Sequence, residues 1–184
     1  MSTTLQAPAT VSAPELMLRC WRDDDVDVLL ETYRDPVLRA RTRDPLVTAA
    51  DARRWVARNR QGWAAGRRFS FAVCEPEPAT GEHRVVACVL LKDVVPGRAY
   101  AEVGYWTAAS ARGRGVASRA LEAVTGWAFT RFAASGLTRL ELLHQIDNPA
   151  SCRVAEKTGY AFVEVLPARP PFPLAGHRHV RQRG

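Results

Sequence analysis

Apolar and polar residues alternate over residues 15–21, and this pattern predicts an opening strand. Apolar residues then recur at helical spacing over residues 23–34 and 48–66, where we expect two helices. The first helix begins with three consecutive aspartates, and Thr48 with Asp51 forms the capping box that starts the second. Pro36 either ends the first helix or begins a turn.

The rest of the chain continues the same pattern of strands and helices. Strands are predicted at residues 69–75, 84–93, 99–107, 138–144 and 160–166. A hairpin loop at 76–81 and a turn at Pro96-Gly97 make the first three of these strands an antiparallel meander. Helices are predicted at 116–132, with Gly136 as its C-cap, and at 148–158, closed by Gly159.

This order of elements predicts an α/β fold, a mixed central sheet flanked by helices on both faces. A helical crossover joins the strands at 99–107 and 138–144, so we expect these two strands to be parallel with a right-handed connection. Residues 167–176 are proline-rich and read as a loop. Residues 177–184 are basic, and we expect either a short edge strand or a loose tail there.

With 184 residues and 47% apolar content, we expect one globular domain over residues 15–184 and a disordered tail over 1–14. No apolar stretch is long enough to cross a bilayer. The four cysteines are scattered without a C-x-x-C pair, which argues against zinc and disulfides and for a reducing cytoplasm. The net charge of +7 is spread along the chain, so an anionic cofactor or partner is expected rather than nucleic acid.

The candidate chemistry centres on a glycine turn between a predicted strand and a predicted helix. Gly113 and Gly115 can adopt a positive φ and let a ligand approach the backbone, and Arg112 and Arg114 add positive charge. The helix that follows presents unpaired N–H groups and the positive end of its dipole. This arrangement predicts a binding site for a diphosphate. Neither a Walker loop nor a dinucleotide fingerprint is present.

Three segments together resemble the GCN5-related N-acetyltransferase (GNAT) superfamily, in the subgroup of ribosomal-protein-alanine N-acetyltransferases. They are the strand Glu102-Val-Gly-Tyr-Trp106, the turn Arg112-Gly-Arg-Gly-Val-Ala117, and the helix Asn148-Pro-Ala-Ser-Cys-Arg-Val-Ala-Glu-Lys-Thr-Gly-Tyr160. The resemblance covers about residues 15–166. It implies a GNAT fold in which two splayed parallel strands form a cleft for acetyl-CoA, the cosubstrate. The cofactor-binding residues that it implies are Trp106, Thr107, Arg112, Gly113, Arg114, Gly115, Val116, Ala117 and Asn148.

The resemblance also implies direct acetyl transfer to a primary amine. Glu102 is the candidate base, because a protonated amine must lose a proton before it attacks. Ala155 stands where many relatives have a tyrosine acid, and the resemblance to the ribosomal subgroup implies Ser151 as the acid in its place. Tyr105 and Tyr160 are weaker candidates, and the favoured interpretation of both is a core or cleft-wall aromatic. A covalent route through Cys152, with His144 as its base, is the less favoured alternative.

The acceptor is a protein N-terminus or a small-molecule amine, and arginines on the early helices favour an acidic one. A non-catalytic acyl-CoA-binding or sensing module is the alternative function, and exposed aromatics on the early helices leave a homodimer open. No metal is expected: His83, His177 and His179 read as loop or tail residues without a cysteine or an acid pair nearby.

Overall fold

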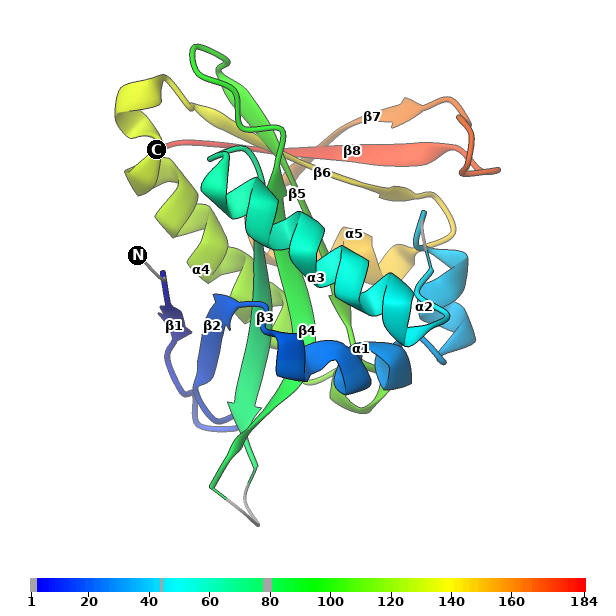
Figure 1. The fold of residues 1–184 in the computed structure, drawn as a ribbon. Coiled ribbons are helices and arrows are strands. Elements are labelled where there is room, and N and C mark those ends of the chain that lie inside the picture. Colours follow the sequence, from blue (N-terminus) through cyan, green and yellow to red (C-terminus); the bar gives the residue numbers. More distant parts are fainter. Residues whose placement is uncertain (1–2, 44, 78–80) are drawn as a thin grey trace.

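An eight-stranded mixed sheet carries the fold, and the computed structural model describes it over residues 3–43, 45–77 and 81–184. Its strands run across the sheet in the order β1-β2-β3-β4-β5-β6-β8-β7 (Figure 1). Their bounds are β1 Leu5–Ala7, β2 Leu16–Cys20, β3 Phe69–Pro76, β4 His83–Lys92, β5 Tyr100–Thr107, β6 Arg139–Gln145, β7 Ala161–Leu166 and β8 Gly176–Gln182.

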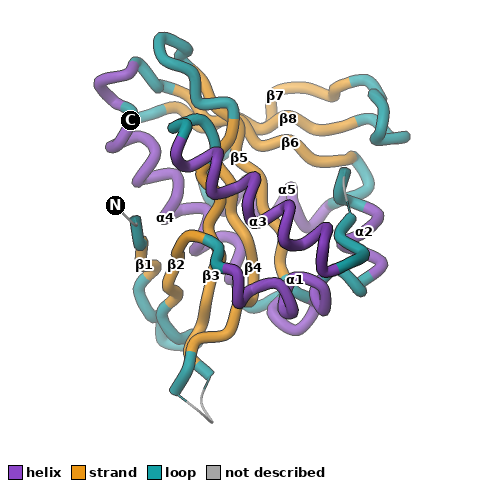
Figure 2. Tube along the Cα trace, viewed as in Figure 1, coloured by secondary structure: helices purple, strands orange, loops and turns teal. Residues whose placement is uncertain are grey.

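The helices connect these strands and lie on both faces of the sheet (Figure 2). Their bounds are α1 Val26–Thr32, α2 Pro36–Ala40, α3 Ala49–Ala64, α4 Val116–Arg131 and α5 Pro149–Lys157, with short 3₁₀ turns η1 Asp23–Asp25, η2 Ala109–Ala111 and η3 Ala133–Ser135. The predicted α/β class with flanking helices is therefore confirmed. Within the described residues, no helix combines the length and apolar character that crossing a bilayer requires.

Two hydrophobic cores lie on opposite faces of the sheet. The alternation of β3 separates them, since Phe71 and Val73 enter one core while Ala72 and Cys74 enter the other. The first core contains the apolar face of α4 and the buried side of α5. The second packs α1 and α3 against the sheet. Strand β3 is thus buried on both sides, which explains its nearly continuous apolar sequence.

Several element boundaries differ from the sequence prediction for local reasons. Pro36 begins α2 with Asp35 as its N-cap, because proline is favoured in the first turn of a helix. The capping box of Thr48 and Asp51 starts α3 as predicted. Gly136 closes the 3₁₀ turn η3 rather than the long helix, whose C-cap is Phe132. The predicted hairpin loop at 76–81 lies partly outside the described residues.

The sequence predicted a disordered tail over residues 1–14, but part of this N-terminal segment is ordered. Strand β1 pairs antiparallel with β2, and Ala7 is buried. Arg119 of α4 fixes the segment further, because its Nη2 donates to the carbonyls of Ala7, Pro8 and Pro14 at 3.2, 2.7 and 2.7 Å. The small, polar composition of residues 1–14 gave no sign of this long-range anchor.

The basic C-terminal residues form an interior strand, not an edge strand or a loose tail. Strand β8 pairs antiparallel with β6 on one side and with β7 on the other. Its sequence is dominated by histidine and arginine, so the apolar alternation that marks most strands is missing. His179 is nevertheless buried.

The parallel pairing of β5 with β6 is confirmed, but it is short. It runs from Tyr100 opposite Arg139 to Val103 opposite Leu142. Beyond this point β5 continues to pair only with β4, and β6 only with β8. Figure 1 shows β6, β8 and β7 turning away from the strands β2–β5. The two parallel strands therefore diverge at residues 104 and 143, as the predicted splay required.

Candidate functional site

The glycine turn lies at the end of β5, immediately before α4. Gly113 and Gly115 both have a φ of 75°, the left-handed conformation that favours glycine. A Cβ atom built on either residue would meet no atom within 4 Å. Gly115 is the N-cap of α4, and no side chain caps this helix. The first N–H groups of α4 therefore have neither an intrahelical acceptor nor a side-chain cap, which suits an anionic ligand.

The two arginines of the turn are already paired with carboxylates. Arg112 binds Asp35, and Arg114 binds the buried Glu75 of β3. Glu75 also accepts from Arg84 Nη2 at 2.7 Å. Our interpretation that both arginine side chains strengthen an anion site is therefore incomplete. Their side chains position the turn, and backbone N–H groups are the donors left for a ligand.

Asp35 links this turn to the other side of the sheet. Its Oδ1 caps α2 by accepting from the N–H of Val37 at 3.0 Å, while its other oxygen binds Arg112. Burial acts to raise the pKa of Asp35, but the hydrogen bonds from Arg112 and from backbone N–H groups outweigh it and lower this pKa below its usual value. The carboxylate therefore holds the glycine turn against α2 at neutral pH.

The end of β5 offers a free backbone edge beside the turn. Trp106 pairs with Cys88 and Thr107 with Ala87, both on β4, so the opposite edge of these residues has no strand partner among the described residues. The ring of Trp106 packs at 6.0 Å from that of Trp21 and forms part of the core wall. An extended ligand could add to this edge as a further strand.

Two hydroxyl groups meet across the divergence of β5 and β6. Tyr105 of β5 donates its O–H to the Oγ of Ser151 on α5 at 3.0 Å. Ser151 is buried, and its N–H donates at 3.3 Å to Oδ1 of Asn148, the N-cap of α5. Burial raises the pKa of Tyr105, with the hydrogen bond to Ser151 as a smaller opposing effect, so the phenol stays protonated at neutral pH.

Tyr160, the other tyrosine considered, has a structural place instead. Its ring is fully buried, and its hydroxyl lies 2.6 Å from the Thr125 Oγ1 of α4. Burial raises its pKa strongly. It joins α4 to the end of α5 in the core, which is the interpretation that the sequence favoured for Tyr160 over a catalytic role.

Glu102 lies on β5 before the divergence. Its Oε1 is 2.7 Å from the Nζ of Lys92 on β4. Glu102 and Tyr105 are three residues apart, so strand alternation places their side chains on opposite faces of the sheet. Tyr105 packs against the core that contains α4, while Trp106, on the same face as Glu102, packs against the core that contains α1 and α3. The carboxylate of Glu102 and the hydroxyl pair of Tyr105 and Ser151 thus lie on opposite faces of the sheet, close to where β5 and β6 diverge.

The sequence suggested His144 as a base beside Cys152 but placed His177 and His179 away from any cysteine, and this second expectation is wrong. His144, Cys152, His177 and His179 come together, and their ligand atoms lie within 4.8 Å of one another. His177 and His179 belong to β8 rather than to a loop or tail. The sequence missed this cluster because only the pairing of β8 with β6 brings the four residues together.

Two of the arginines on the early elements are also paired. Arg41 Nη1 lies 3.0 Å from Oδ1 of Asp147, in the connection between β6 and α5. Arg54 binds Asp51 within α3. These ion pairs reduce the free positive charge near α2 and α3, so the charge argument for an acidic acceptor is weaker than the sequence indicated.

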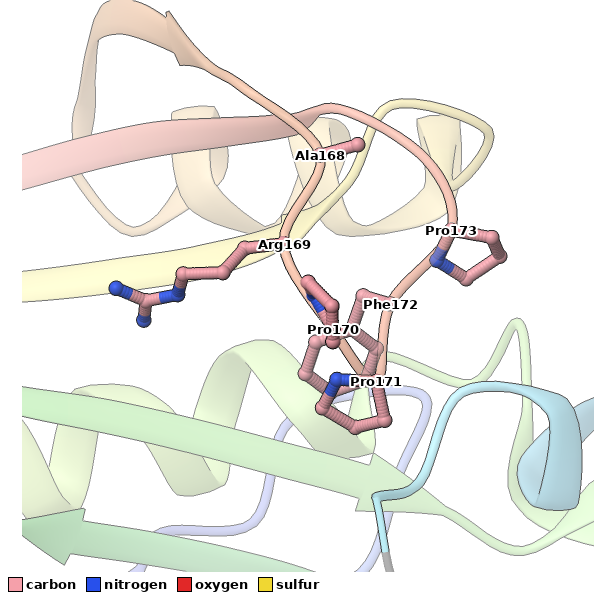
Figure 3. A pocket seen from close by; sticks show the side chains of 6 residues that line it. All are labelled: Ala168, Arg169, Pro170, Pro171, Phe172 and Pro173. Atoms are coloured by element: carbon pink, nitrogen blue, oxygen red, sulfur yellow. The ribbon is translucent and has the colours of Figure 1, made fainter.

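A separate surface hollow lies in the loop between β7 and β8. Figure 3 shows that Pro170, Pro171 and Phe172 gather on the same side of this loop. The residues that line the hollow are Ala168, Arg169, Pro170, Pro171, Phe172 and Pro173. Arg169 is the one charged group among them. This lining has no nucleophile and no titratable base, so it does not provide the chemistry of the β5–β6 divergence.

The mixed sheet with helices on both faces defines an α/β domain, and comparison with known families identifies its class. The family described as acetyltransferase (GNAT) domain matches residues 15–161. Because this match covers most of the chain, the protein belongs to the GNAT acetyltransferase family.

A relative from the curated proteins is similar over part of the chain. Over 80 residues the chain is 32% identical to the ribosomal-protein-serine acetyltransferase of Escherichia coli (strain K12), a match that covers 43% of this chain and 42% of that protein. The chain therefore matches less than half the length of that relative.

Two solved structures share the fold over nearly the whole chain. RimL, a ribosomal L7/L12 alpha-N-protein acetyltransferase in complex with coenzyme A, superposes with a TM-score of 0.80 and 17% identity, covering 96% of this chain and 97% of that one. The second is a Salmonella typhimurium acetyl transferase that modifies the N-terminal serine of 50S ribosomal subunit protein L7/L12. It superposes with a TM-score of 0.76 and 18% identity, covering 97% of this chain and 99% of that one. At identities of 17% and 18%, the similarity to these two structures establishes a shared fold alone.

Proposed function

We propose that this protein is an acetyl-CoA-dependent N-acetyltransferase that acetylates a primary amine by direct attack. The observation that carries the proposal is the end of the β5–β6 pairing at Val103 and Leu142, on the strand that leads into the glycine turn and the uncapped N-terminus of α4. A free strand edge and a set of backbone donors there suit the two ends of one long ligand, an amide-containing arm and a diphosphate.

Each part of coenzyme A has a matching group in this region. The backbone N–H groups of residues 112–117 would bind the diphosphate, because Gly113 and Gly115 leave open space above the turn. Trp106 and Thr107 would pair with the pantetheine arm through their free backbone edge. Asn148 would contact the arm from the start of α5, since its Oδ1 is used in capping and its amide group remains as a donor.

The side chains that flank the divergence can supply the proton transfers. Glu102 would accept the proton of the incoming amine, directly or through a water, on the face that carries α1 and α3. Ser151 would donate its hydroxyl proton to the departing thiolate on the opposite face. Tyr105 already donates to Ser151, so its proton can replace the one that Ser151 loses, and water then returns a proton to the Tyr105 oxygen. A backbone N–H near Trp106 would stabilise the oxyanion.

For the acceptor we propose a protein N-terminus. The support is the naming of the matched relatives as acetyltransferases of ribosomal proteins. Small-molecule amines are the competing acceptors.

For the compartment we propose a reducing cytoplasm. The four cysteines are free thiols, in keeping with this proposal.

Calorimetric titration with acetyl-CoA tests the cofactor site. Gly115→Asp places a negative charge at the uncapped helix N-terminus and should weaken binding at least tenfold. Gly97→Asp is the matched control, because Gly97 has a φ of 77° and equally open space but lies in the turn before β5. Equal affinities of the two variants would remove the proposed diphosphate site.

An acceptor screen tests the reaction itself. The assay measures thiol release from acetyl-CoA with peptides that differ in their N-terminal residue, and with spermidine and other amines, followed by mass spectrometry of the product. We expect acetyl groups on peptide N-termini. Tight acetyl-CoA binding without thiol release across the panel would instead favour a non-catalytic acyl-CoA-binding module.

A further inference from the structure

Three histidines gather on one face of the β6–β8 pair. His144 of β6 lies directly opposite His177 of β8, and His179 follows two residues later on the same face of β8. Helix α5 follows β6 after a short connection and places Cys152 against these rings. The topology thus brings three imidazoles and a thiol from three elements to one place.

The distances within this cluster fit a tetrahedral metal site. The Nε2 atoms of His144 and His179 are 3.2 Å apart, and the Sγ of Cys152 lies 3.6 Å from His144 Nε2 and 3.3 Å from His177 Nδ1. With Zn–N bonds of about 2.0 Å and Zn–S bonds of about 2.3 Å, a tetrahedron places two nitrogens about 3.3 Å apart and a nitrogen and a sulfur about 3.6 Å apart. These three distances therefore match a tetrahedron, and all four ligand atoms lie within 4.8 Å of one another, so small movements of the side chains complete the site.

The outer hydrogen bonds orient two of the rings for this purpose. His144 Nδ1 lies 2.9 Å from the Gln145 carbonyl, and His179 Nδ1 lies 3.4 Å from the Tyr160 carbonyl. A carbonyl oxygen can only accept, so each Nδ1 carries the proton and each Nε2 presents a lone pair to the cluster. Two facing lone pairs repel each other, and a shared cation removes that repulsion. Ligating histidines commonly have such carbonyl partners.

We propose that His144, Cys152, His177 and His179 form a structural zinc site. Nitrogen and sulfur donors without a carboxylate suit Zn²⁺ and exclude the oxygen-ligand cations Ca²⁺ and Mg²⁺. The protein supplies all four ligands, which is typical of a closed structural site rather than a catalytic one. Binding replaces the Cys152 thiol proton by the metal and releases that proton to solvent.

Such a site would hold the start of α5 against β6 and β8. Cys152 follows Ser151, whose hydroxyl accepts from Tyr105, so the metal would also fix the position of the proposed proton donor. Phe162 of β7 lies with its ring 5.1 Å from that of His177 and shields one side of the cluster. The metal site rests on its own residues, so it stands or falls independently of the proposed acetyl transfer.

Cobalt substitution of the tag-free full chain tests the site directly. Purified, metal-stripped protein titrated with Co²⁺ should bind one equivalent and show the visible d–d absorption of a tetrahedral site, together with a thiolate-to-cobalt charge-transfer band. Added Zn²⁺ should displace the cobalt. Absence of one-equivalent binding by the wild-type chain would overturn the proposal without any variant.

Variants then identify the ligands. Cys152→Ser should abolish the charge-transfer band, and His177→Ala should weaken Zn²⁺ binding by roughly 100-fold in competition with a chromophoric chelator. Cys20→Ser and His83→Gln are matched controls outside the cluster and should leave both readouts unchanged. If Cys152→Ser keeps the band, or if His177→Ala binds zinc as tightly as the wild type, the assignment is wrong.

Discussion

At the scale of single residues, Glu102, the proposed base, does not have a free side chain. It is held by Lys92 on the face opposite Tyr105. Glu102→Gln should lower kcat by roughly 100-fold with little change in acetyl-CoA affinity, because a base must be ionised to accept the proton of the amine. The acidic limb of the pH profile of turnover should disappear with it.

The control for this prediction is Glu164→Gln. Glu164 is a carboxylate of β7 that binds Arg178 at 2.6 Å, remote from the glycine turn. Its substitution should leave turnover and its pH profile as in the wild type. A Glu102→Gln profile that keeps the acidic limb would assign the base to another group.

Ser151 and Tyr105 form a hydrogen-bonded pair, so their substitutions separate two roles. Ser151→Ala should reduce kcat more than Tyr105→Phe if the serine hydroxyl donates to the thiolate and the tyrosine only replaces its proton. Steady-state kinetics with saturating acetyl-CoA measures both. A larger loss of kcat in Tyr105→Phe would make the phenol the donor, and an unchanged kcat in Ser151→Ala would remove the serine from the reaction.

Residue types were easier to predict than their partners. The motif spacing identified Gly113 and Gly115, and both have the positive φ that their type permits. The sequence could not show that Arg114 binds Glu75, or that Tyr105 reaches Ser151, since these contacts join elements far apart in the chain. The placement of His177 and His179 was wrong for the same reason, whereas the core position expected for Tyr160 is confirmed.

At the scale of elements, local periodicity located most strands and the long helices. It failed at β1 and β8, where the decisive contacts are long-range. Strand β8 has alternating polar side chains whose burial depends on β6 and β7. Strand β1 is short, and its order depends on β2 and on Arg119 of α4. The local sequence carries no sign of these long-range contacts of β8 and β1.

Arg119 provides a test of how the N-terminal segment is held. Arg119→Met keeps most of the aliphatic stem but removes the donors to three carbonyls. Amide exchange in residues 3–14 should become roughly tenfold faster, a loss of about 1.4 kcal/mol of local protection. Hydrogen-exchange mass spectrometry measures this. Arg131→Met, at the other end of α4 over the ring of Phe132, should leave these amides unchanged. Equal protection in both variants would contradict the anchor.

Asp35 connects two elements, and its effect on stability should depend on pH. Its pKa is lowered in the folded protein, against about 3.9 in an unfolded chain. Its contribution is therefore fully present above the unfolded pKa and is lost as the pH falls through the lower folded pKa. Asp35→Asn should reduce the free energy of unfolding by about 1 kcal/mol at pH 7.

Denaturant unfolding at several pH values checks the sign. The difference between Asp35→Asn and the wild type should stay constant above about pH 5 and shrink below about pH 4. Asp27→Asn, at an exposed position on α1, serves as the comparison and should show no such dependence. A difference that grows as the pH falls would mean that Arg112 does not stabilise the Asp35 carboxylate.

At the scale of the whole molecule, the sheet consists of two parts with a short joint. Within the part of the chain that the structure describes, strands β1–β5 and the group β6, β8 and β7 are paired directly only along residues 100–103 of β5. The bond from Tyr105 to Ser151 and the ion pair from Arg41 to Asp147 are further links between the two parts. A ligand that occupies the divergence would contact both parts at once.

Acetyl-CoA should therefore stabilise the folded chain as a unit. At a free concentration 100 times its Kd, the ligand adds about 2.7 kcal/mol to the free energy of unfolding. For a chain of this length that corresponds to a rise in Tm of roughly 5 to 11 °C. Scanning calorimetry with and without acetyl-CoA measures it. Gly97→Asp should keep the rise, and Gly115→Asp should lose about half of it or more at the same ligand concentration. A rise that is equal in both variants would place the ligand away from the glycine turn, and no rise in the wild type would mean that acetyl-CoA does not bind the folded chain in preference to the unfolded one.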